Sequence, residues 1–570
     1  MIDASASPRV RRVLRILLNR HVVFLLVLYL YALAMDYRGG IQSHAFFSQW
    51  IELLFLLYFY SYFYRILQPG RWRTVLAAVP ILVGYLIQDI YFLVYGKVFH
   101  LIAVLELPEL LQVIPLGYGA IMVVFVILPM TLFLLAVNYR RYKTVLLGAL
   151  PVGMLIGLIM VSPSAYTDFI NRAGNGIVQY SDAKSVESNG RYTMLFYREA
   201  ERQNALAATL PYHNRVSYEQ AIAARANRLQ KNANHKNVHL IVLESFLDPR
   251  LFELARFSKD PAHPDFEKLF GKNLGFSVSP VFGGASAQAE FEVLCGVPAL
   301  DQLSSVEFNV FTGTPAYCLP GVLGKIGYRT IASNAYKPSF FNAPLAYQGI
   351  GFAEAYFPRE YSGVSNTYLS TGDVQTEHFM FDEVLFDQNL AFVKKHLQSG
   401  SHAPLFNYMM TIYGHTPHTL DPVRRPEVLQ VLSGNGDAEL QRAANQFYYR
   451  TRAIAHYVNA LIRMDRNSLI ILVSDHVPPL QYGPDTYHEL HYLGNAENAD
   501  YLNRLMIIEN GHPVVYRTMR HFDIPDVVLN FITGGKHCRE QSCGFLQKER
   551  NLNRWAFLDR YYTLMAHAAE

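Results

Sequence analysis

The apolar residues of this chain are concentrated before residue 164, in five long segments. Each segment has about the length that a helix needs to cross a bilayer, although the first and the last must borrow flanking residues. The segments cover roughly 21–35, 46–67, 75–96, 119–137 and 145–161. We therefore predict a five-helix transmembrane domain over residues 1–163.

The cationic residues around these segments indicate their orientation. They cluster before the first segment, after the second and after the fourth, whereas the opposite loops have no cationic cluster. The clustered residues are Arg9, Arg11, Arg12, Arg15, Arg20, Arg65, Arg71, Arg73, Arg140, Arg141 and Lys143. Because lysine and arginine are retained on the cytoplasmic side, we expect the N-terminus inside and everything after residue 163 outside. A cleaved signal peptide fits the first segment less well, since four more segments follow it.

Residues 97–118 are apolar but are interrupted by Pro108 and Pro115. The two prolines make this stretch a poor sixth span, and we predict a helix that lies on the outer leaflet. The choice matters, because a sixth span would move the rest of the chain to the cytoplasmic side.

Two acidic residues, Glu52 and Asp89, interrupt the second and third apolar segments at a similar depth in the outer half. An ionisable group inside a span is a functional candidate, and these two could line an access path for a lipid head group. The alternative is a shared proton or a hydrogen bond inside the helical bundle.

Beyond the apolar segments the chain becomes polar and then alternates between strand-like and helical runs. Residues 164–236 indicate a linker that contains a helix over about 218–229. The alternation over residues 237–570 predicts an α/β domain with a mostly parallel central sheet. Residues 551–570 are aromatic and receive no assignment. The strand-like runs lie at 238–245, 327–333, 404–412 and 468–476, and the helical ones at 266–272, 287–295, 439–464 and 524–532.

Two of the strand-like runs end on acidic residues. Residues 238–245, VHLIVLES, finish with Glu244, and residues 468–476, SLIILVSDH, finish with Asp475 and His476. Continuous apolar runs of this length are typical of buried parallel strands. Taken singly, each acid is equally well explained as a loop or turn residue. Ligands bind beyond the carboxyl ends of such strands, so together the three side chains predict one site, occupied by a metal ion.

Ser286 is the candidate nucleophile. It follows a Gly-rich turn and stands just ahead of the helical pattern 287–295. A hydroxyl at a helix N-terminus faces unpaired N–H groups and the positive end of the dipole, which favour its alkoxide and an anionic phosphoryl group. The alternative is a plain helix cap, which is the commoner role of serine at such a position.

The net charge and the positions of the cysteines limit the possible binding partners and the cellular compartment. The formal net charge of +4 is accounted for by the predicted cytoplasmic arginines, so nucleic acid binding has no support. All four cysteines lie in the predicted exterior part, which suits an oxidising compartment. Of three possible pairings, the most economical joins Cys295 to Cys318 and Cys538 to Cys543.

The motifs around these residues resemble a known family. Glu244 in NVHLIVLES, Ser286 in GGASAQAEF, His415 in YGHTPH and the pair Asp475-His476 in VSDH are similar to motifs of the lipoteichoic acid synthase group. That group belongs to the alkaline phosphatase and sulfatase superfamily. The phosphoethanolamine transferases of lipid A and the phosphoglycerol transferases of periplasmic glucans share its plan. The predicted spans, linker and exterior domain match as well, so the resemblance covers nearly the whole chain.

The resemblance implies chemistry for each of these residues. Ser286, where the family usually has Thr, would attack a phospholipid donor, releasing diacylglycerol and leaving a covalent phospho-Ser intermediate. A hydroxyl of an envelope glycan or glycolipid would then accept the head-group phosphate. His415 would protonate the leaving oxygen or hold the phosphate, unless it is only a hydrogen-bonded strand-end histidine. One divalent metal ion (zinc, manganese or magnesium) would be held by Glu244, Ser286, Asp475 and His476.

The resemblance also implies a place in the cell and a head-group site. The protein would be a multi-pass protein of the bacterial inner membrane, with catalytic residues 237–570 on the periplasmic side. Lipoteichoic acid synthases grip phosphoglycerol with a His, a Trp and an Arg, where this chain has Asn334, Phe341 and Ala343. An alanine does not replace a bidentate arginine, although Lys337 could supply one charge. The donor is therefore expected to be phosphatidylethanolamine, or phosphatidylglycerol held differently.

The last predictions concern two further histidines and two alternatives to the transferase function. His488 and His491 in YHELH loosely resemble a late metal or phosphate histidine of the phosphoethanolamine branch, and a surface helix explains them equally well. A metal-dependent phosphodiesterase or sulfatase-type hydrolase would use the same site with water as acceptor. A sulfatase needs its Cys or Ser within C/S-x-P-x-R, which GASAQAE lacks. The remaining alternative is an inactive structural subunit of an envelope glycan machine.

Overall fold

The computed structural model divides the chain into two compact units, Met1–Ala207 and Ala208–Glu570. The boundary lies inside residues 164–236, the predicted linker. Four of the N-terminal arginines and most of the predicted outer-leaflet helix over 97–118 lie outside the described residues. The structure describes residues 19–37, 41, 48–95, 98–106, 122–177, 182–304, 306–363, 366–372, 374, 377–400, 403–547 and 554–570.

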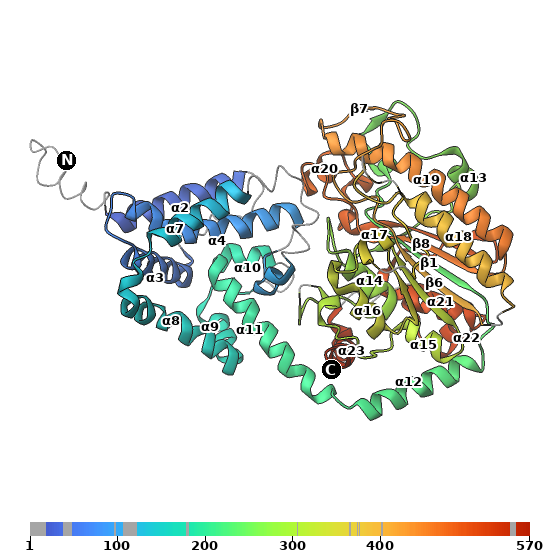
Figure 1. Cartoon of the computed structure of the whole chain (residues 1–570), viewed down its shortest axis with the longest axis horizontal. Helices are drawn as coiled ribbons and strands as arrows, with labels where there is room; N and C mark the ends of the chain where they lie inside the picture. Colours follow the sequence, from blue (N-terminus) through green and yellow to red (C-terminus); the bar gives the residue numbers. More distant parts are fainter. Residues whose placement is uncertain are drawn as a thin grey trace, which may run out of the picture. The chain divides into compact units, whose positions relative to one another are not determined.

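The first unit is helical in its described residues, with a helix in each predicted span (Figure 1). Two helices are long and apolar enough to cross a membrane, over Arg73–Leu93 and Tyr139–Val161. Arg20–Met35 and Val123–Ala136 are apolar but shorter, so the five-span arrangement stays a prediction. The helices are α2 Arg20–Tyr37, α3 Trp50–Ile66, α4 Arg73–Tyr95, the 3-10 helix η2 Leu101–Glu106, the π-helix η3 Val123–Ile127, α7 Leu128–Ala136, the 3-10 helix η4 Tyr139–Arg141, α8 Tyr142–Val161, α9 Pro163–Ala173, α10 Asp182–Asn189 and α11 Arg191–Thr209.

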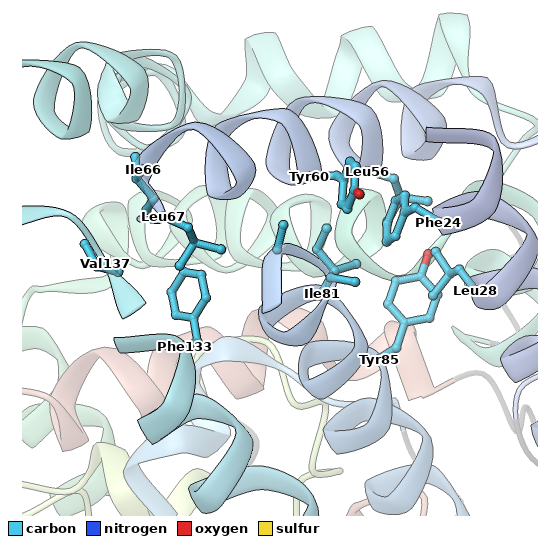
Figure 2. Close-up of a cluster of buried hydrophobic side chains, with 12 residues drawn as sticks. Phe24, Leu28, Leu56, Tyr60, Ile66, Leu67, Ile81, Tyr85, Phe133 and Val137 are labelled. Atoms are coloured by element: carbon cyan, nitrogen blue, oxygen red, sulfur yellow. The ribbon is translucent and has the colours of Figure 1, made fainter. Parts of the chain in front are cut away.

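Helices α2, α3, α4 and α7 share an apolar core (Figure 2). The rings of Phe24 and Tyr60 are stacked with centroids 4.4 Å apart, and Leu56 and Ile81 are buried between the helices. By contrast, α7 and α8 expose large apolar side chains, including Leu135 at 73% and Leu147 at 70%. A continuous exposed apolar surface is unfavourable in water and is typical of helices that face lipid or another protein.

The two acidic residues of the apolar segments are hydrogen-bonded inside the first unit. This agrees with the predicted alternative of a hydrogen bond inside the helical bundle. Glu52 accepts hydrogen bonds from the hydroxyl of Tyr85 at 2.7 Å and from the backbone N–H of Thr193 at 2.8 Å. Asp89 forms a buried ion pair with Arg191, with a shortest N–O distance of 2.6 Å. Both acids therefore hold the start of helix α11, and Glu52 satisfies N–H groups that a helix N-terminus leaves unpaired.

The second unit contains a nine-stranded sheet in the order β11-β3-β9-β8-β1-β6-β4-β5, with β10 paired to β9. The central strands β8, β1, β6, β4 and β5 are parallel, whereas β9 is antiparallel to β8, β3 and β10. This confirms the mostly parallel α/β sheet. The strands are β1 Val238–Leu243, β3 Gly275–Val278, β4 Arg329–Asn334, β5 Glu354–Tyr356, β6 Leu405–Met410, β8 Leu469–Ser474, β9 Leu502–Glu509, β10 His512–Val514 and β11 Met519–Arg520, and a separate pair is β2 Arg256–Phe257 with β7 Val431–Ser433.

Helices cover both faces of this sheet. Helices α13, α18 and α19 lie on one side, and α14 and α16 lie on the other (Figure 1). The helix predicted over 439–464 spans Ala438–Met464, and the unassigned C-terminal stretch contains the packed helix α23. The helices are α12 Arg215–Gln230, α13 Pro264–Phe270, α14 Ser286–Cys295, α15 Leu319–Lys325, α16 Ala343–Ile350, α17 Arg359–Ser362, α18 Asp382–Gln398, α19 Ala438–Met464, α20 Pro484–Glu489, α21 Ile524–Ile532, α22 Lys536–Glu540 and α23 Leu558–Ala568.

Both predicted disulfides are confirmed. Cys295 is bonded to Cys318, which joins the end of α14 to the start of α15. Cys538 is bonded to Cys543 near the C-terminal end of the chain. The first bond closes a loop of 23 residues around the connection after α14, so it restricts the unfolded chain more than the second does.

A buried carboxyl group on α14 predicts that stability depends on pH. Glu292 accepts hydrogen bonds from the backbone N–H of Ala299 at 3.0 Å and from Arg554 at 2.8 Å. Burial nevertheless raises the pKa of Glu292 to about 7 from its ordinary value of 4.5, with Arg554 opposing the rise. Between these two values the folded chain holds a proton that the unfolded chain releases. The free energy of unfolding therefore falls as pH rises through that window.

We expect Glu292→Gln to remove this dependence, because the amide keeps the acceptor oxygen and does not titrate. From pH 4.5 to 7 the variant should gain about 3 kcal/mol in stability relative to the original chain, as the shift in the pKa of Glu292 implies. Chemical denaturation of the full chain in detergent, followed by circular dichroism at several pH values, measures the difference. A difference that is independent of pH would show that Glu292 titrates normally.

Candidate metal centre and active site

Three neighbouring strands deliver the candidate residues to one edge of the sheet. In the parallel pair of β1 and β8, Leu243 is aligned with Ser474. Glu244 and Asp475 are the next residues of their strands, so they leave the sheet side by side. Strand β6 pairs with the other side of β1, and the loop after it carries His415. The shared strand direction thus brings together residues that are more than 200 positions apart.

The two oxygens of Asp475 differ in their hydrogen bonds to the residues that the structure describes. Its Oδ1 accepts hydrogen bonds from the backbone N–H groups of Ser245 at 2.7 Å and of His476 at 2.6 Å. Its Oδ2 is buried and accepts no hydrogen bond from the residues that the structure describes. A buried carboxylate oxygen in this condition is costly unless a cation or a proton satisfies it.

His476 is oriented toward the same point. Its Nδ1 lies 3.0 Å from the carbonyl oxygen of Val477, which can only accept, so Nδ1 carries the hydrogen. The lone pair of the neutral ring is therefore on Nε2. That atom lies 3.3 Å from Asp475 Oδ2 and 3.8 Å from Glu244 Oε1. A backbone carbonyl that fixes the tautomer in this way is usual for metal-binding histidines.

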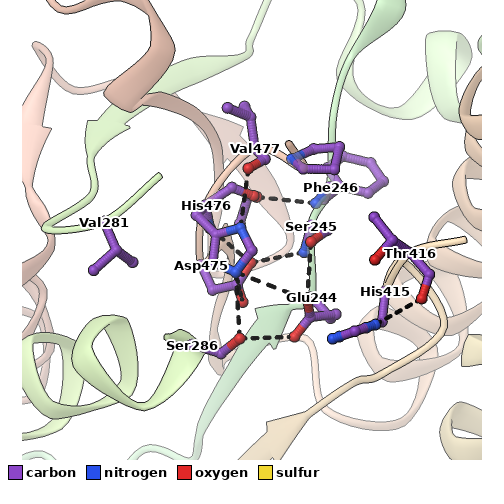
Figure 3. A network of polar contacts seen from close by, with 12 residues as sticks. Glu244, Ser245, Phe246, Val281, Ser286, His415, Thr416, Asp475, His476 and Val477 are labelled. Atoms are coloured by element: carbon purple, nitrogen blue, oxygen red, sulfur yellow. Dashed lines mark hydrogen bonds and ion pairs between the residues drawn. The ribbon is translucent and has the colours of Figure 1, made fainter. Parts of the chain in front are cut away.

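Glu244 and Ser286 complete the cluster (Figure 3). The Ser286 hydroxyl donates to Glu244 Oε2 at 2.9 Å, and its Oγ lies 3.3 Å from His476 Nε2. The other oxygen of Glu244 accepts a hydrogen bond from the Ser245 hydroxyl at 2.8 Å. The candidate nucleophile therefore contacts both an acidic and an imidazole side chain.

The charges of the cluster fit a cation. Burial opposes ionisation of Glu244, but the neighbouring His476 and His415 lower its pKa overall. Burial and the adjacent Glu244 carboxylate raise the pKa of Asp475 well above its ordinary value. Two buried carboxylates side by side repel each other unless a positive charge lies between them.

The donor atoms of this cluster also fit a metal ion. Single donor atoms of Glu244, Asp475 and His476 lie within 4.8 Å of one another. Two carboxylate oxygens and an imidazole nitrogen suit zinc, manganese or magnesium. A second group of similar residues, Asp526, His537 and Cys543, includes a sulfur that is already used in a disulfide.

Ser286 is the first residue of helix α14, and the residue before it has an unusual backbone. Ala285 lies in the left-handed region with φ of 59°. A non-glycine residue adopts this conformation only where the surroundings require it, and such residues are frequent at functional sites. The turn directs the Ser286 hydroxyl toward the cluster, and the side chain keeps 7% of its surface exposed.

His415 lies beside the cluster, on the loop after β6. Its Nδ1 is 2.8 Å from the carbonyl oxygen of Thr416, so this nitrogen carries a hydrogen. The other edge of the ring points toward Glu244 and Ser286 (Figure 3). Nε2 is therefore the nitrogen that can exchange a proton with a substrate held there.

The predicted head-group residues of the β4–α16 connection lie on an aromatic wall next to His415. The ring of His415 is 5.1 Å from that of Phe379, which is 5.9 Å from that of Tyr336. Lys337 Nζ lies 5.5 Å from the centre of the Tyr336 ring. Phe341, in the left-handed region at φ of 50°, packs on Phe340 with a ring distance of 4.3 Å.

Asn334 is the buried member of this predicted set. It is the last residue of β4, and its side-chain amide donates to the hydroxyl of Tyr347 at 2.9 Å. Its side-chain oxygen accepts from the backbone N–H of Tyr336 at 2.9 Å. Asn334 thus supports the wall rather than standing in front of it.

His488 and His491 lie elsewhere on the surface. Both side chains are exposed, His488 on the short helix α20 and His491 just after it. Neither belongs to the two metal-type groups that the described residues form. Their location fits the surface helix that was the alternative prediction for this pair.

Several residues that hold the cluster were not predicted. The hydroxyl of Thr411 accepts a hydrogen bond from the backbone N–H of Glu244 at 2.9 Å. Ser279 donates to the backbone carbonyl of Asp475 at 2.5 Å, and Ser245 contacts both acids. Only Ser245 had a signal in the sequence, because it directly follows Glu244. Thr411 and Ser279 reach the site through strand pairing, which no local pattern shows.

Residues 236–529 match the sulfatase family. This range contains Glu244, Ser286, His415, Asp475 and His476. A Rhizobium meliloti protein, named provisionally for modification of cyclic beta-1,2-glucan, is 24% identical over 250 residues. Those residues are 43% of this chain and 36% of that protein, so the chain spans little more than a third of the length of this curated relative.

Two solved structures are also similar. The lipoteichoic acid synthase LtaP of Listeria monocytogenes is 17% identical with a TM-score of 0.42, over 55% of this chain and 78% of that chain. The phosphoglycerol transferase GacH of Streptococcus pyogenes, solved with sn-glycerol-1-phosphate, is 15% identical with a TM-score of 0.44. That similarity covers 64% of this chain and 92% of the other.

Proposed function

Because this chain belongs to the sulfatase family, we propose that it is a membrane-anchored, metal-dependent transferase of phospholipid head groups. It moves phosphoethanolamine or phosphoglycerol from a lipid, through a covalent intermediate on Ser286, to a hydroxyl of an envelope glycan or glycolipid. The observation that carries this proposal is the Ser286 hydroxyl, which lies 2.9 Å from Glu244 and 3.3 Å from His476 at the start of α14.

The metal ion would be held by Glu244, Asp475 and His476, with Ser286 as a further ligand. When bound, such an ion polarises the phosphoryl group and favours the deprotonated serine. The chain's own residues supply the rest of the geometry. The hydroxyl hydrogen of Ser286 already faces an acceptor, Glu244 Oε2, and the N-terminal N–H groups of α14 favour a phosphoryl group on Ser286.

The first half-reaction forms a bond between Ser286 Oγ and phosphorus and breaks the bond between phosphorus and the diacylglycerol oxygen. Ser286 gives its proton to Glu244 Oε2, and His415 supplies a proton to the leaving oxygen from Nε2. The Thr416 carbonyl holds the ring for this transfer through Nδ1. In the second half-reaction the acceptor oxygen forms a bond to the same phosphorus and the bond between phosphorus and Ser286 Oγ breaks. His415 takes the proton of the acceptor hydroxyl, and Ser286 Oγ regains its proton from Glu244 Oε2.

A lipid donor fits the first unit of the chain. Two helices have the length and composition of membrane spans, and α7 and α8 expose apolar side chains. We propose that residues 1–163 form the predicted five-helix membrane domain in the bacterial inner membrane. Residues 164–236 are then the linker, and residues 237–570 form the catalytic domain on the periplasmic side. The glucan named for the Rhizobium meliloti relative supports a glycan acceptor.

The wall beside His415 limits how the head group is held. Lys337 offers one cationic charge there, while Phe341 and Ala343 offer none. One ammonium group binds a phosphate as a point charge, without the two-pronged contact of an arginine. The proposed donors are therefore phosphatidylethanolamine, or phosphatidylglycerol held mainly by its phosphate.

The experiment that tests the function is to trap the intermediate. The full chain in detergent is mixed with phosphatidylethanolamine or phosphatidylglycerol and the metal ion, quenched in acid and analysed by peptide mass spectrometry. We expect the mass of one head-group phosphate on the peptide that contains Ser286, and its absence in Ser286→Ala. The adduct mass identifies the donor. Adducts from neither lipid, in protein shown to contain metal, would contradict the transferase.

The same experiment separates the transferase from a hydrolase. A phosphodiesterase with this site would release the free head-group phosphate into water as fast as it releases diacylglycerol. We expect the transferase to release diacylglycerol only up to one equivalent until a glycan acceptor is added. Steady release without acceptor would favour the hydrolase.

A further inference from the structure

A second acidic side chain lies one turn beyond the nucleophile on α14. Glu290 is four residues after Ser286 and therefore lies on the same face of the helix. It is 96% buried. Its Oε2 accepts hydrogen bonds from the hydroxyls of Tyr347 at 2.7 Å and of Tyr408 at 2.5 Å.

The two tyrosines belong to the elements that carry the rest of the site. Tyr408 is in β6, the strand that precedes His415. Tyr347 is on α16, and its hydroxyl accepts a hydrogen bond from Asn334 at the end of β4. Three elements, which carry the nucleophile, the candidate general acid and the head-group wall, therefore meet at one carboxyl group.

The connection continues from Asn334 to the wall itself. The side-chain oxygen of Asn334 accepts from the backbone N–H of Tyr336, whose ring contacts Phe379. Phe379 in turn contacts the ring of His415. A shift of α14 relative to β4 would thus change both the hydrogen bonds of Glu290 and the distance between Ser286 and this wall.

We propose that Glu290 is a positioning residue, whose carboxyl group sets the distance between the Ser286 hydroxyl and the wall that holds the lipid phosphate. This inference rests on the proposed function, because it requires that Ser286 attacks a substrate held there. A nucleophile must lie close to and in line with the phosphorus, and a displacement of about 1 Å can lower a rate about 100-fold. Glu290 does not touch the substrate.

The neutral form of the side chain is sufficient for this role. The tyrosines donate both hydrogen bonds to one oxygen, so a glutamine carbonyl can accept them as well. Burial also raises the pKa of Glu290 to about 7, with the two tyrosine hydroxyls opposing the rise. A methionine has nearly the same length but accepts no strong hydrogen bond, so it removes the acceptor of both tyrosine hydroxyl groups.

The test compares these two substitutions in the full chain, reconstituted in vesicles of phosphatidylethanolamine and phosphatidylglycerol. Diacylglycerol release is followed against the donor fraction, with metal and acceptor present. We expect Glu290→Met to lower the maximal rate about 10- to 100-fold. Glu290→Gln should stay within about threefold of the original chain. Tyr347→Phe removes the hydroxyl that joins Glu290 to Asn334 but keeps the hydrogen bond from Tyr408 to Glu290, and it should mainly raise the donor fraction at half-maximal rate.

Glu292 provides the matched control. It lies two residues further along the same helix and is equally buried, but it contacts Arg554 and Ala299 instead. Glu292→Met should lose thermal stability as Glu290→Met does, while its maximal rate stays within about threefold. If Glu290→Met does not fold, the double variant Tyr347→Phe and Tyr408→Phe replaces it with the same expected rate.

Three results would overturn the inference: a normal rate in Glu290→Met, an equal loss in Glu290→Gln, or an equal loss in the Glu292→Met control. Failure of the proposed function is recognised separately. In that case the original chain releases no more diacylglycerol than Ser286→Ala does. If the original chain is active and Ser286→Ala is inactive, the results for the Glu290 variants test only the positioning role of Glu290.

Discussion

Ser286→Ala is expected to lower the rate of head-group transfer by about a thousandfold or more, because it removes the hydroxyl on which the proposed covalent intermediate forms. The loss should appear in the maximal rate rather than in donor affinity, since the groups that we propose to hold the lipid phosphate remain. Removing the hydroxyl deletes its hydrogen bond to Glu244 but leaves the start of α14 unchanged. Release of diacylglycerol from labelled lipid in detergent micelles, with metal and a glycan acceptor present, measures the effect.

Two further variants make this result specific. Ser286→Thr restores a hydroxyl at the same carbon, and it should recover much of the activity that alanine removes. Ser304→Ala deletes a buried hydroxyl elsewhere in the second unit and should leave the rate within about twofold. Full activity in Ser286→Ala, with normal folding and membrane insertion, would remove Ser286 from the reaction.

The strands that carry the site residues could be predicted because their short apolar sequences are typical of buried strands. Residues 238–243 and 469–474 are fully buried in the structure, and both read as continuous apolar runs. A strand covered on both faces has no polar side to show alternation. The acids that follow such runs leave the sheet at its carboxyl edge, so their approach to each other follows from strand direction alone.

Other parts of the fold could not be predicted, because they depend on contacts between distant segments. Strand β9 is antiparallel to both of its main neighbours, β8 and β3, and nothing within residues 502–509 records that direction. The role of Thr411 as an acceptor for Glu244 depends on how β6 pairs with β1. Single-sequence patterns describe which face of an element is apolar but not which element covers it.

The hydrogen bonds of Glu290, next to the proposed nucleophile Ser286, also depend on contacts between distant segments. The spacing of Ser286 and Glu290 places both on one helical face, and this could be seen in the sequence. The tyrosines that hold Glu290 come from β6 and α16, more than 50 residues further along the chain. Their convergence is a property of the folded sheet and its covering helices.

In the apolar first unit, the short length of some helices limits the prediction of membrane spans. A run such as 21–35 has the composition of a span, but its apolar helix Arg20–Met35 is shorter than the two that qualify. A short apolar helix can cross a membrane with its flanks, lie along it, or pack within the bundle. Composition alone does not separate these cases.

Removal of the proposed metal ligand Asp475 is expected to have the second large effect. In Asp475→Asn the amide oxygen can still accept from the backbone N–H groups of Ser245 and His476, so the local fold should persist. The amide nitrogen replaces the buried Oδ2, which accepts no hydrogen bond from the described residues. The site then loses one of its two carboxylates, and we expect transfer to fall by about a thousandfold or more.

The stability of this variant should change with opposite signs in the two metal states. Without metal, Asp475→Asn should be more stable than the original chain, because it removes a buried charge that Glu244 repels. With metal at about 100 times its dissociation constant, the original chain should gain about 2.7 kcal/mol and the variant almost nothing. Metal content of the purified chains and thermal denaturation with and without chelator measure both effects.

Equal metal content in the two proteins, or full activity of the original chain after exhaustive chelation, would contradict the metal centre. The decisive result is that the variant is the more stable protein without metal and the original chain is the more stable protein with metal. If the carboxylate of Asp475 had a purely structural role, its removal would destabilise the chain in both states.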